Sequence, residues 1–298
     1  MRKPPKLTDT QKAIVLGDKI PLATAAFRKH PQIFHFPPPR IGGELNDRMT
    51  ILAGIIGKQV IMIGADSQWT ISTTGTTVNA DKISVVKFGS DDVLISQGGL
   101  RPITTDIIDR IKDASENVNI IRPRDVTQVI NKAVQETKSS LGEDEATYGK
   151  TYGAALLIAF YAKGKPYIYT CNIFDTGVSE PAESHFTTIG IADPLANYLF
   201  CELSKRGDDD ALQLAAMIYM ILKVKENNAF CGGPTRIKLL KTFPDEMHTT
   251  GGRATEVDAS FIKRAEEVLI LRDQQSREER NRQMIAILRE VASGFFKT

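Results

Sequence analysis

Three residues of this sequence have the types and the spacing that nucleophilic catalysis requires: Thr50, Asp66 and Lys82. Thr50 begins an apolar run, Asp66 follows a second run and Lys82 precedes a third, and the two intervals between them are equal in length. Because the start of one strand lies beside the end of its hairpin partner, we expect Thr50 and Asp66 to lie close together. A third strand paired alongside would bring Lys82 to them.

The chemistry that these residues could perform follows from their pKa values. A threonine hydroxyl is a poor nucleophile until a base removes its proton. If Thr50 is the first residue of the mature chain, its own α-amino group, with an ordinary pKa of about 7.7 to 8.0, is well suited to act as that base. A nearby Lys82 ammonium would lower the pKa of both the hydroxyl and the amine, and Asp66 would keep Lys82 charged and oriented.

Short strands and two pairs of helices are expected to position this trio. Continuous apolar runs at 50–56 and 60–65, joined by a turn at 57–59, predict a hairpin buried on both faces. Asp125, with Gln128 three residues later, predicts a helix that starts at a capping box. Other strands are expected at 82–88, 93–96, 154–161, 166–172, 186–191 and 236–240. Three other helices are expected: one around 103–111, one that starts at Asp193 and stops at Gly207, and one that follows 208–210 and ends at about Lys225. This order predicts an α+β fold with antiparallel sheets packed together and helices outside.

The two ends of the chain differ from this central region. Residues 1–49 are rich in proline, which predicts an N-terminal extension or propeptide, either docked on the domain or disordered. Residues 50–250 are expected to form the folded domain. Residues 251–298 have apolar positions at helical spacing among arginines and glutamates, which predicts an amphipathic helical tail. That tail either packs on its own domain or binds a partner.

The composition excludes several classes of function. The chain has 298 residues and a formal net charge of only +2, so there is no electrostatic case for binding nucleic acid or an anionic membrane. Three cysteines and four histidines show no metal-ligand spacing, so we expect no metal and no cofactor. No apolar run approaches the roughly 20 residues that span a bilayer. A cytoplasmic location is therefore expected.

Four segments together resemble a known family. They are Thr50–Ile55, Ile63–Ser67, Asp81–Ile83 and Ser96–Gly99, and they are similar to the pattern of proteasome β-subunits, the N-terminal-nucleophile (Ntn) hydrolases that include bacterial proteasome homologues. The resemblance extends over roughly residues 50–245. It implies a four-layer αββα sandwich of the proteasome-subunit type, flanked by the N-terminal arm and the C-terminal helical tail.

The resemblance also implies roles for individual residues. It implies a threonine-type endopeptidase with catalytic Thr50, Asp66 and Lys82, in which the backbone N–H of Gly98 stabilises the oxyanion and Thr70 binds the substrate backbone. Supporting residues near the nucleophile are expected just before a Gly-Gly pair. At that place this chain has Asn228 and Cys231 as secondary candidates.

The chain departs from the family pattern at three places. Met49 precedes Thr50, where self-processed members usually have glycine. Removal of residues 1–49 would free the amine, and so would a translation start at Met49 followed by removal of that methionine by an aminopeptidase. Asn228 and Cys231 stand where the family has aspartate and serine. Thr188 and Gly190 are the nearest candidates for a further serine that the family has before its third helix.

Three functions are consistent with this pattern. The first is a threonine peptidase of a proteasome-like particle, with unfolded polypeptide as substrate. The second is a non-catalytic, ring-forming subunit, since an uncleaved leader would hold the amine in a peptide bond. The third is an Ntn amidase that acts on a small molecule. Self-association into rings is expected, with other proteasome-like subunits or an ATPase as further partners.

Overall fold

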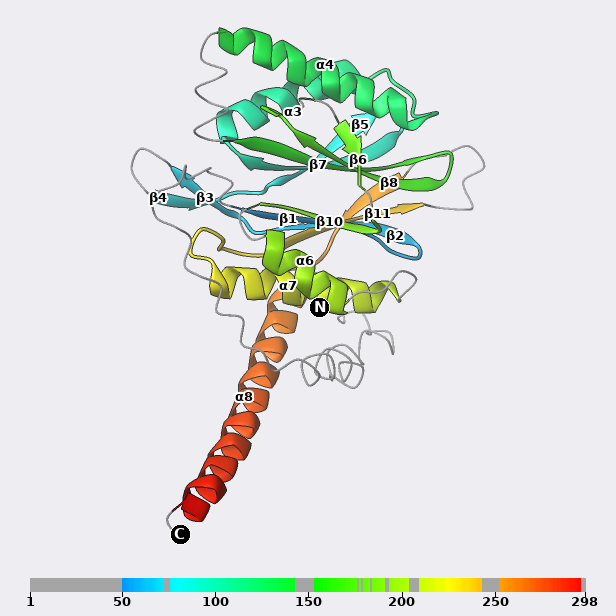
Figure 1. Ribbon diagram of the computed structural model, residues 1–298. Helices are drawn as coiled ribbons and strands as arrows, with labels where there is room; N and C mark the ends of the chain where they lie inside the picture. Colours follow the sequence, from blue (N-terminus) through cyan, green and yellow to red (C-terminus); the bar gives the residue numbers. More distant parts are fainter. Residues whose placement is uncertain are drawn as a thin grey trace, which may run out of the picture.

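The computed structural model describes residues 50–71, 76–142, 153–175, 177, 179–182, 184–190, 193–203, 209–242 and 252–295. Within this part of the chain, two five-stranded antiparallel sheets lie face to face, with helices on their outer sides (Figure 1). The prediction of an α+β fold with antiparallel sheets is confirmed. The predicted N-terminal extension, residues 1–49, lies outside the described residues.

The first sheet carries the hairpin that opens the domain. Its spatial order is β10 (Phe186–Gly190), β1 (Ile51–Ile56), β2 (Val60–Ala65), β11 (Arg236–Thr242) and β12 (Gly252–Glu256). All of β2 and nearly all of β1 are buried, as continuous apolar runs predict. The side chains of β1 alternate: Ile51 and Ala53 join the core under the helices, whereas Leu52 joins the core between the sheets.

The second sheet stacks on the first. Its order is β5 (Ile83–Phe88), β6 (Asp91–Gly99), β7 (Ala154–Ala162), β8 (Lys165–Asn172) and β9 (Ser179–Pro181). Two helices, α3 (Arg101–Ser115) and α4 (Pro123–Leu141), cover its outer side (Figure 1). Their isoleucines and valines bury themselves against β5, β6 and β7. The helical spacing of the apolar residues thus places one face of each helix on the sheet.

The outer side of the first sheet is covered by α6 (Asp193–Leu203) and α7 (Asp210–Asn227) (Figure 1). The long helix α8 (Ala259–Phe295) begins against α7 and then leaves the body of the molecule. Two ion pairs fix its first turns to α7, from Lys223 Nζ to Asp273 Oδ2 at 2.6 Å and from Lys225 Nζ to Glu266 Oε1 at 2.7 Å. Both lysines are largely buried, so these pairs are more rigid than exposed ones.

Several elements, among them the short strand β9, differ from the predictions. A separate hairpin of β3 (Gln68–Ile71) and β4 (Thr76–Asn79) was not predicted, because polar threonines and a glycine obscure its pattern. The first sheet continues beyond residue 250, since β12 pairs with β11 inside the predicted tail. Helix α4 begins at Pro123, so Asp125 is its third residue and not its N-cap. Its carboxylate still takes part in a capping box, since it accepts a 2.7 Å hydrogen bond from the backbone N–H of the N-cap residue, Arg122.

Among the described residues, none of the helices combines the length and apolarity needed to cross a membrane.

Close approach of β10 to the start of β1 generates the first prediction. Gly190 has φ of +137°, and a Cβ there would lie 1.9 Å from the carbonyl oxygen of Thr50. We expect Gly190→Ala to lower the free energy of unfolding by at least about 3 kcal/mol, because backbone strain and overlap with a neighbouring strand add together. The midpoint of urea denaturation measures this loss.

Gly142→Ala is the matched control for that substitution. Gly142 also has a positive φ, +57°, but a Cβ there would meet nothing within 4 Å. We expect strain alone, about 1–3 kcal/mol and less than the loss in Gly190→Ala. Equal losses in the two variants would show that the contact with Thr50 is unimportant.

Candidate active site

Thr50, Asp66 and Lys82 meet in one buried hydrogen-bonded network. The Thr50 hydroxyl donates to Asp66 Oδ1 at 2.7 Å, and Lys82 Nζ donates to the same carboxylate oxygen at 2.8 Å and to Thr50 Oγ1 at 2.5 Å. The three residues are at most 2% exposed. A nucleophilic side chain, a cation and an anion are therefore held together away from bulk water.

The two sheets bring these residues together from different sides. Thr50 and Asp66 lie at adjacent ends of β1 and β2, where Asp66 N also donates to Ile51 O. Lys82 directly precedes β5, which belongs to the second sheet. The prediction that the third strand pairs alongside the hairpin was therefore wrong. Lys82 instead reaches across the space between the sheets, which a long flexible side chain can do.

The Asp66 carboxylate is the centre of the network. Its Oδ1 also accepts from Ile51 N at 3.0 Å, and its Oδ2 accepts from Gln68 N at 3.3 Å and Gly232 N at 3.1 Å. Hydrogen bonds on both oxygens compensate for removing the carboxylate from water. Asp66 thus connects the first hairpin, β3 and the loop before β11.

Lys82 experiences two opposing influences on its charge. Burial lowers the pKa of the Lys82 ammonium below its ordinary value of 10.5, and this is the largest cause; attraction and hydrogen bonding to Asp66 oppose the shift. The indole of Trp69 lies over the ammonium, with 5.2 Å between Nζ and the ring centroid. Lys82 is therefore a cation that can lose its proton more readily than a surface lysine.

Gly98, the predicted oxyanion residue, lies against the nucleophile. It is in β6, and a Cβ at this position would lie 2.6 Å from Thr50 Cγ2. Only a residue without a side chain lets the β6 backbone come this close. Thr70, the predicted substrate-binding residue, lies in β3 opposite Thr77; its side chain is outside the described part of the structure.

The secondary candidates have other partners. Asn228 ends α7, and its Oδ1 accepts a 2.9 Å hydrogen bond from Phe230 N within its own turn. Cys231 is buried beside Asp66 and Lys82, and burial raises the pKa of its thiol to about 12. A thiol with that pKa stays protonated at neutral pH and is a poor nucleophile.

The other two candidates also have local roles. Thr188 in β10 donates to Asn197 Oδ1 at 3.1 Å, which ties the strand to α6. Gly190 pairs opposite Ile51 beside the Thr50 carbonyl.

Sequence reasoning missed two groups in this network. The Gly232 N–H, far along the chain, binds Asp66 because the loop before β11 folds back over the end of β2. Trp69 was overlooked, although it is the chain's single tryptophan and follows Asp66 by three positions. In the described residues, no group of three or more His, Cys, Asp or Glu side chains could hold a metal ion.

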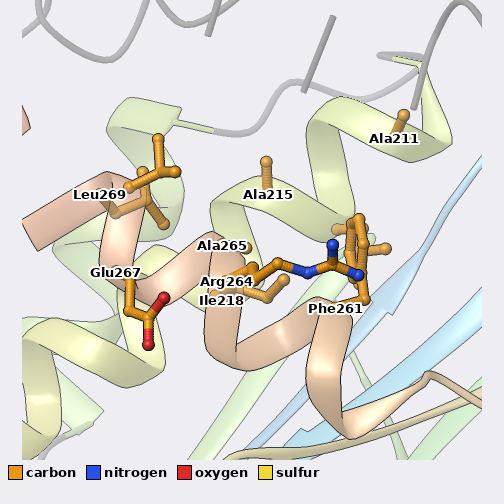
Figure 2. Close-up of a pocket in the computed structure, with 10 residues that line it drawn as sticks. Ala211, Ala215, Ile218, Phe261, Arg264, Ala265, Glu267 and Leu269 are labelled. Atoms are coloured by element: carbon orange, nitrogen blue, oxygen red, sulfur yellow. The ribbon is translucent and has the colours of Figure 1, made fainter. Parts of the chain in front are cut away.

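A cavity of about 240 Å³ lies elsewhere, between α7 and α8. Mostly apolar side chains of the two helices line it (Figure 2). It includes none of the residues around Thr50. We therefore place the candidate site at Thr50, because the charged and nucleophilic groups converge there.

Comparison with known proteins identifies the fold. No family model matches the chain, and no curated protein matches it. Among solved structures, the stacked sheets and their helices match Anbu proteins, which have a proteasome-like fold. The Anbu complex from Pseudomonas aeruginosa, a helical assembly, is 14% identical with a TM-score of 0.61 over 76% of this chain and 96% of that one.

Two other Anbu structures give the same result. The Gly-1 mutant of Anbu from Hyphomicrobium sp. strain MC1 is 15% identical with a TM-score of 0.57, and the match covers 77% of this chain and 99% of that one. Anbu from Yersinia bercovieri, described as an ancestral beta-subunit, is 12% identical with a TM-score of 0.57 over 73% of this chain and 92% of that one.

These findings correct the family assignment made from sequence. The prediction of membership in the proteasome β-subunit family was wrong, because the matching structures belong to the distinct Anbu family and no family model matches. At such low identity the likeness shows the fold alone. A few residues around a buried site can resemble a family pattern while the rest of the chain does not.

The central position of Asp66 generates the second prediction. We expect Asp66→Asn to lower the free energy of unfolding by about 3–5 kcal/mol, because it leaves a buried lysine without its counter-charge. Asp109→Asn is the control: Asp109 pairs with Lys112 at the same 2.8 Å separation, but both side chains are more than half exposed. Its loss should stay below about 1 kcal/mol. Urea denaturation of both variants measures these losses. Similar shifts of the denaturation midpoint in the two variants would contradict the prediction.

Proposed function

We propose that this protein, once its chain begins at Thr50, is a threonine-type amide hydrolase of the Ntn class that cleaves polypeptide. The observation that carries the proposal is the buried network in which the Thr50 hydroxyl contacts both Asp66 Oδ1 and Lys82 Nζ. The αββα arrangement of the Ntn class fits the order of layers in Figure 1. The Anbu-like fold supports this class without establishing activity.

The proposed reaction starts with removal of the hydroxyl proton. The free α-amine of Thr50 takes this proton through a water molecule, and Oγ1 attacks the substrate carbonyl carbon. Negative charge then develops on the carbonyl oxygen. We assign its stabilisation to the backbone N–H of Gly98, because Gly98 packs against the Thr50 side chain. The amine of the substrate leaves with a proton, and water hydrolyses the resulting ester on Thr50.

Lys82 and Asp66 supply the electrostatics of this mechanism. The Lys82 ammonium, in hydrogen-bond contact with Thr50 Oγ1, stabilises the alkoxide that forms as the proton leaves. Asp66 holds Lys82 in place and accepts from Ile51 N, which fixes the backbone next to the nucleophile. Because the site is buried, each of these interactions is stronger than it would be in water.

The peptide bond between Met49 and Thr50 controls this activity. In the full sequence the Thr50 nitrogen is an amide, which cannot serve as the base. Removal of residues 1–49 would create the α-amine. If residues 1–49 are retained, the protein has the second candidate function, that of a non-catalytic subunit.

Self-association is part of the proposal. The Anbu complex of P. aeruginosa is a helical assembly, and this chain has the same fold. We therefore expect subunits of this protein to assemble into a ring or a helical turn. Other subunits and an ATPase remain predicted partners.

The third prediction concerns the free amine. A chain released so that it begins at Thr50 should hydrolyse unfolded polypeptide, whereas the full chain and a Thr50→Ala variant of the released chain should lose at least about 100-fold in kcat/KM. Cleavage of a fluorogenic peptide measures activity, and intact mass verifies the first residue.

Controls distinguish the remaining alternatives. Thr50→Ser keeps a hydroxyl and should retain measurable activity. Assemblies of the released chain that leave both peptides and small amides uncut would support the structural-subunit function. Cleavage of small amides without peptides would support an amidase instead.

The fourth prediction is the pH dependence of that activity. The α-amine must be neutral, so kcat/KM should fall as pH drops below the pKa of that amine, which the Lys82 ammonium holds under its ordinary value of about 8. Lys82 must be charged, and because burial lowers its pKa, activity should also fall before pH reaches 10.5. Lys82→Arg keeps its charge to higher pH and should move the alkaline limb upward. An unchanged alkaline limb would rule out Lys82 as its origin.

A further inference from the structure

Three residues from separate elements meet at one indole ring beside the candidate site. Lys82 Nζ lies 5.2 Å from the centroid of the Trp69 ring, and Arg101 Cζ lies 5.7 Å from the same centroid. Lys82 is 1% exposed and Trp69 is 7% exposed, whereas Arg101 is exposed to solvent. The indole thus contacts a buried cation and a surface cation.

Ring contacts hold the indole in this position. Trp69 Nε1 is buried and has no hydrogen-bond partner in the described structure. Its orientation therefore depends on packing and on the two cations over the ring. Arg101 is the first residue of α3 and is followed by Pro102, which fixes the backbone at the helix start. The guanidinium is therefore presented from a rigid element.

We propose that Trp69 and Arg101 are positioning residues that keep water from the Lys82 ammonium and thereby set the pH at which Lys82 loses its proton. Trp69 covers the ammonium, and Arg101 holds the indole over it. The catalytic meaning of this arrangement rests on the proposed function. The protonation of Lys82 itself is measurable without any activity.

The direction of the effect follows from comparing magnitudes. Full burial lowers a lysine pKa by up to about 3–5 units, whereas a cation–π contact favours the charged form by on the order of one unit. Water exclusion therefore outweighs the attraction of the ring. The positive charge of Arg101 acts in the same direction as burial, because like charges disfavour protonation.

Other groups that face Lys82 belong to three more elements. Asp66 at the end of β2 raises the pKa of Lys82 by attraction and hydrogen bonding, and Cys231 in the loop before β11 also raises it. The Thr50 hydroxyl accepts from Lys82 Nζ and carries no charge. Substitutions of Trp69 or Arg101 leave these groups in place, so their effects can be separated from that of the ion pair.

Trp69 is also the chain's single tryptophan, which makes it a reporter on Lys82. A change from ammonium to amine under the ring alters its emission. The full chain, excited where tyrosine does not absorb, is titrated from neutral to alkaline pH. Lys82→Met is the reference, because ionisation of the tyrosines near pH 10 affects its emission as much as that of the unsubstituted chain. The difference between the two titrations isolates the proton of Lys82.

Arginine variants test the second part of the proposal. We expect a Lys82-dependent transition below pH 10.5 in the unsubstituted chain. Arg101→Gln should shift that midpoint upward by about one unit and move the emission to longer wavelength, because both water access and loss of a positive charge favour the protonated lysine. Arg124→Gln, an exposed arginine on α4 with the same change in charge, should leave both unchanged.

Trp69 itself is tested with 13C-labelled lysine, since its replacement removes the fluorophore. The Lys82 signal is assigned by its absence in Lys82→Met. Trp69→Phe should keep a lowered midpoint and Trp69→Ala should raise it toward 10.5. The proposal is overturned if the unsubstituted chain shows no Lys82-dependent transition below pH 10.5. It is equally overturned if Arg101→Gln changes the emission while the midpoint stays fixed.

Discussion

Burial of one charged pair between two sheets constrains much of this structure. Lys82 and Asp66 are both at most 1% exposed, and removing such a pair from water is unfavourable unless hydrogen bonds compensate for it. The compensation comes from backbone N–H groups of Ile51, Gln68 and Gly232, which lie far apart in the sequence. The ends of β1 and β2, the start of β3 and the loop before β11 must therefore converge on Asp66.

The surrounding apolar layers and glycines make this convergence feasible. Separate clusters of buried side chains fill the space between the sheets and the space under each helical layer. These clusters fix the distance that Lys82 must cross. At the site itself, Gly98 and Gly190 leave room for the backbone of β6 and β10 to approach Thr50, where any side chain would overlap with it. Close packing thus determines the position of the nucleophile.

The likeness to Anbu proteins extends over about three quarters of this chain at 12–15% identity. A fold can persist at such identity because many sequences satisfy the same pattern of buried and exposed positions. The site is more demanding, since an uncompensated charge in it would destabilise the protein. In this chain Cys231 lies beside the network without an ionised side chain, and Trp69 and Arg101 add a cation–π contact beside Lys82.

The sequence by itself determined most of the strands of the two large sheets and the trio Thr50, Asp66 and Lys82, because apolar runs and residue spacing depend only on local order. It also indicated the antiparallel α+β class. Only the tertiary structure decided that Lys82 comes from the opposite sheet, that β12 extends the first sheet and that Gly232 binds Asp66. These features depend on which distant segments share a buried space, and local sequence carries no record of that choice. Trp69 belongs with them, since it lies in the separate β3–β4 hairpin and approaches Lys82 only in the folded chain.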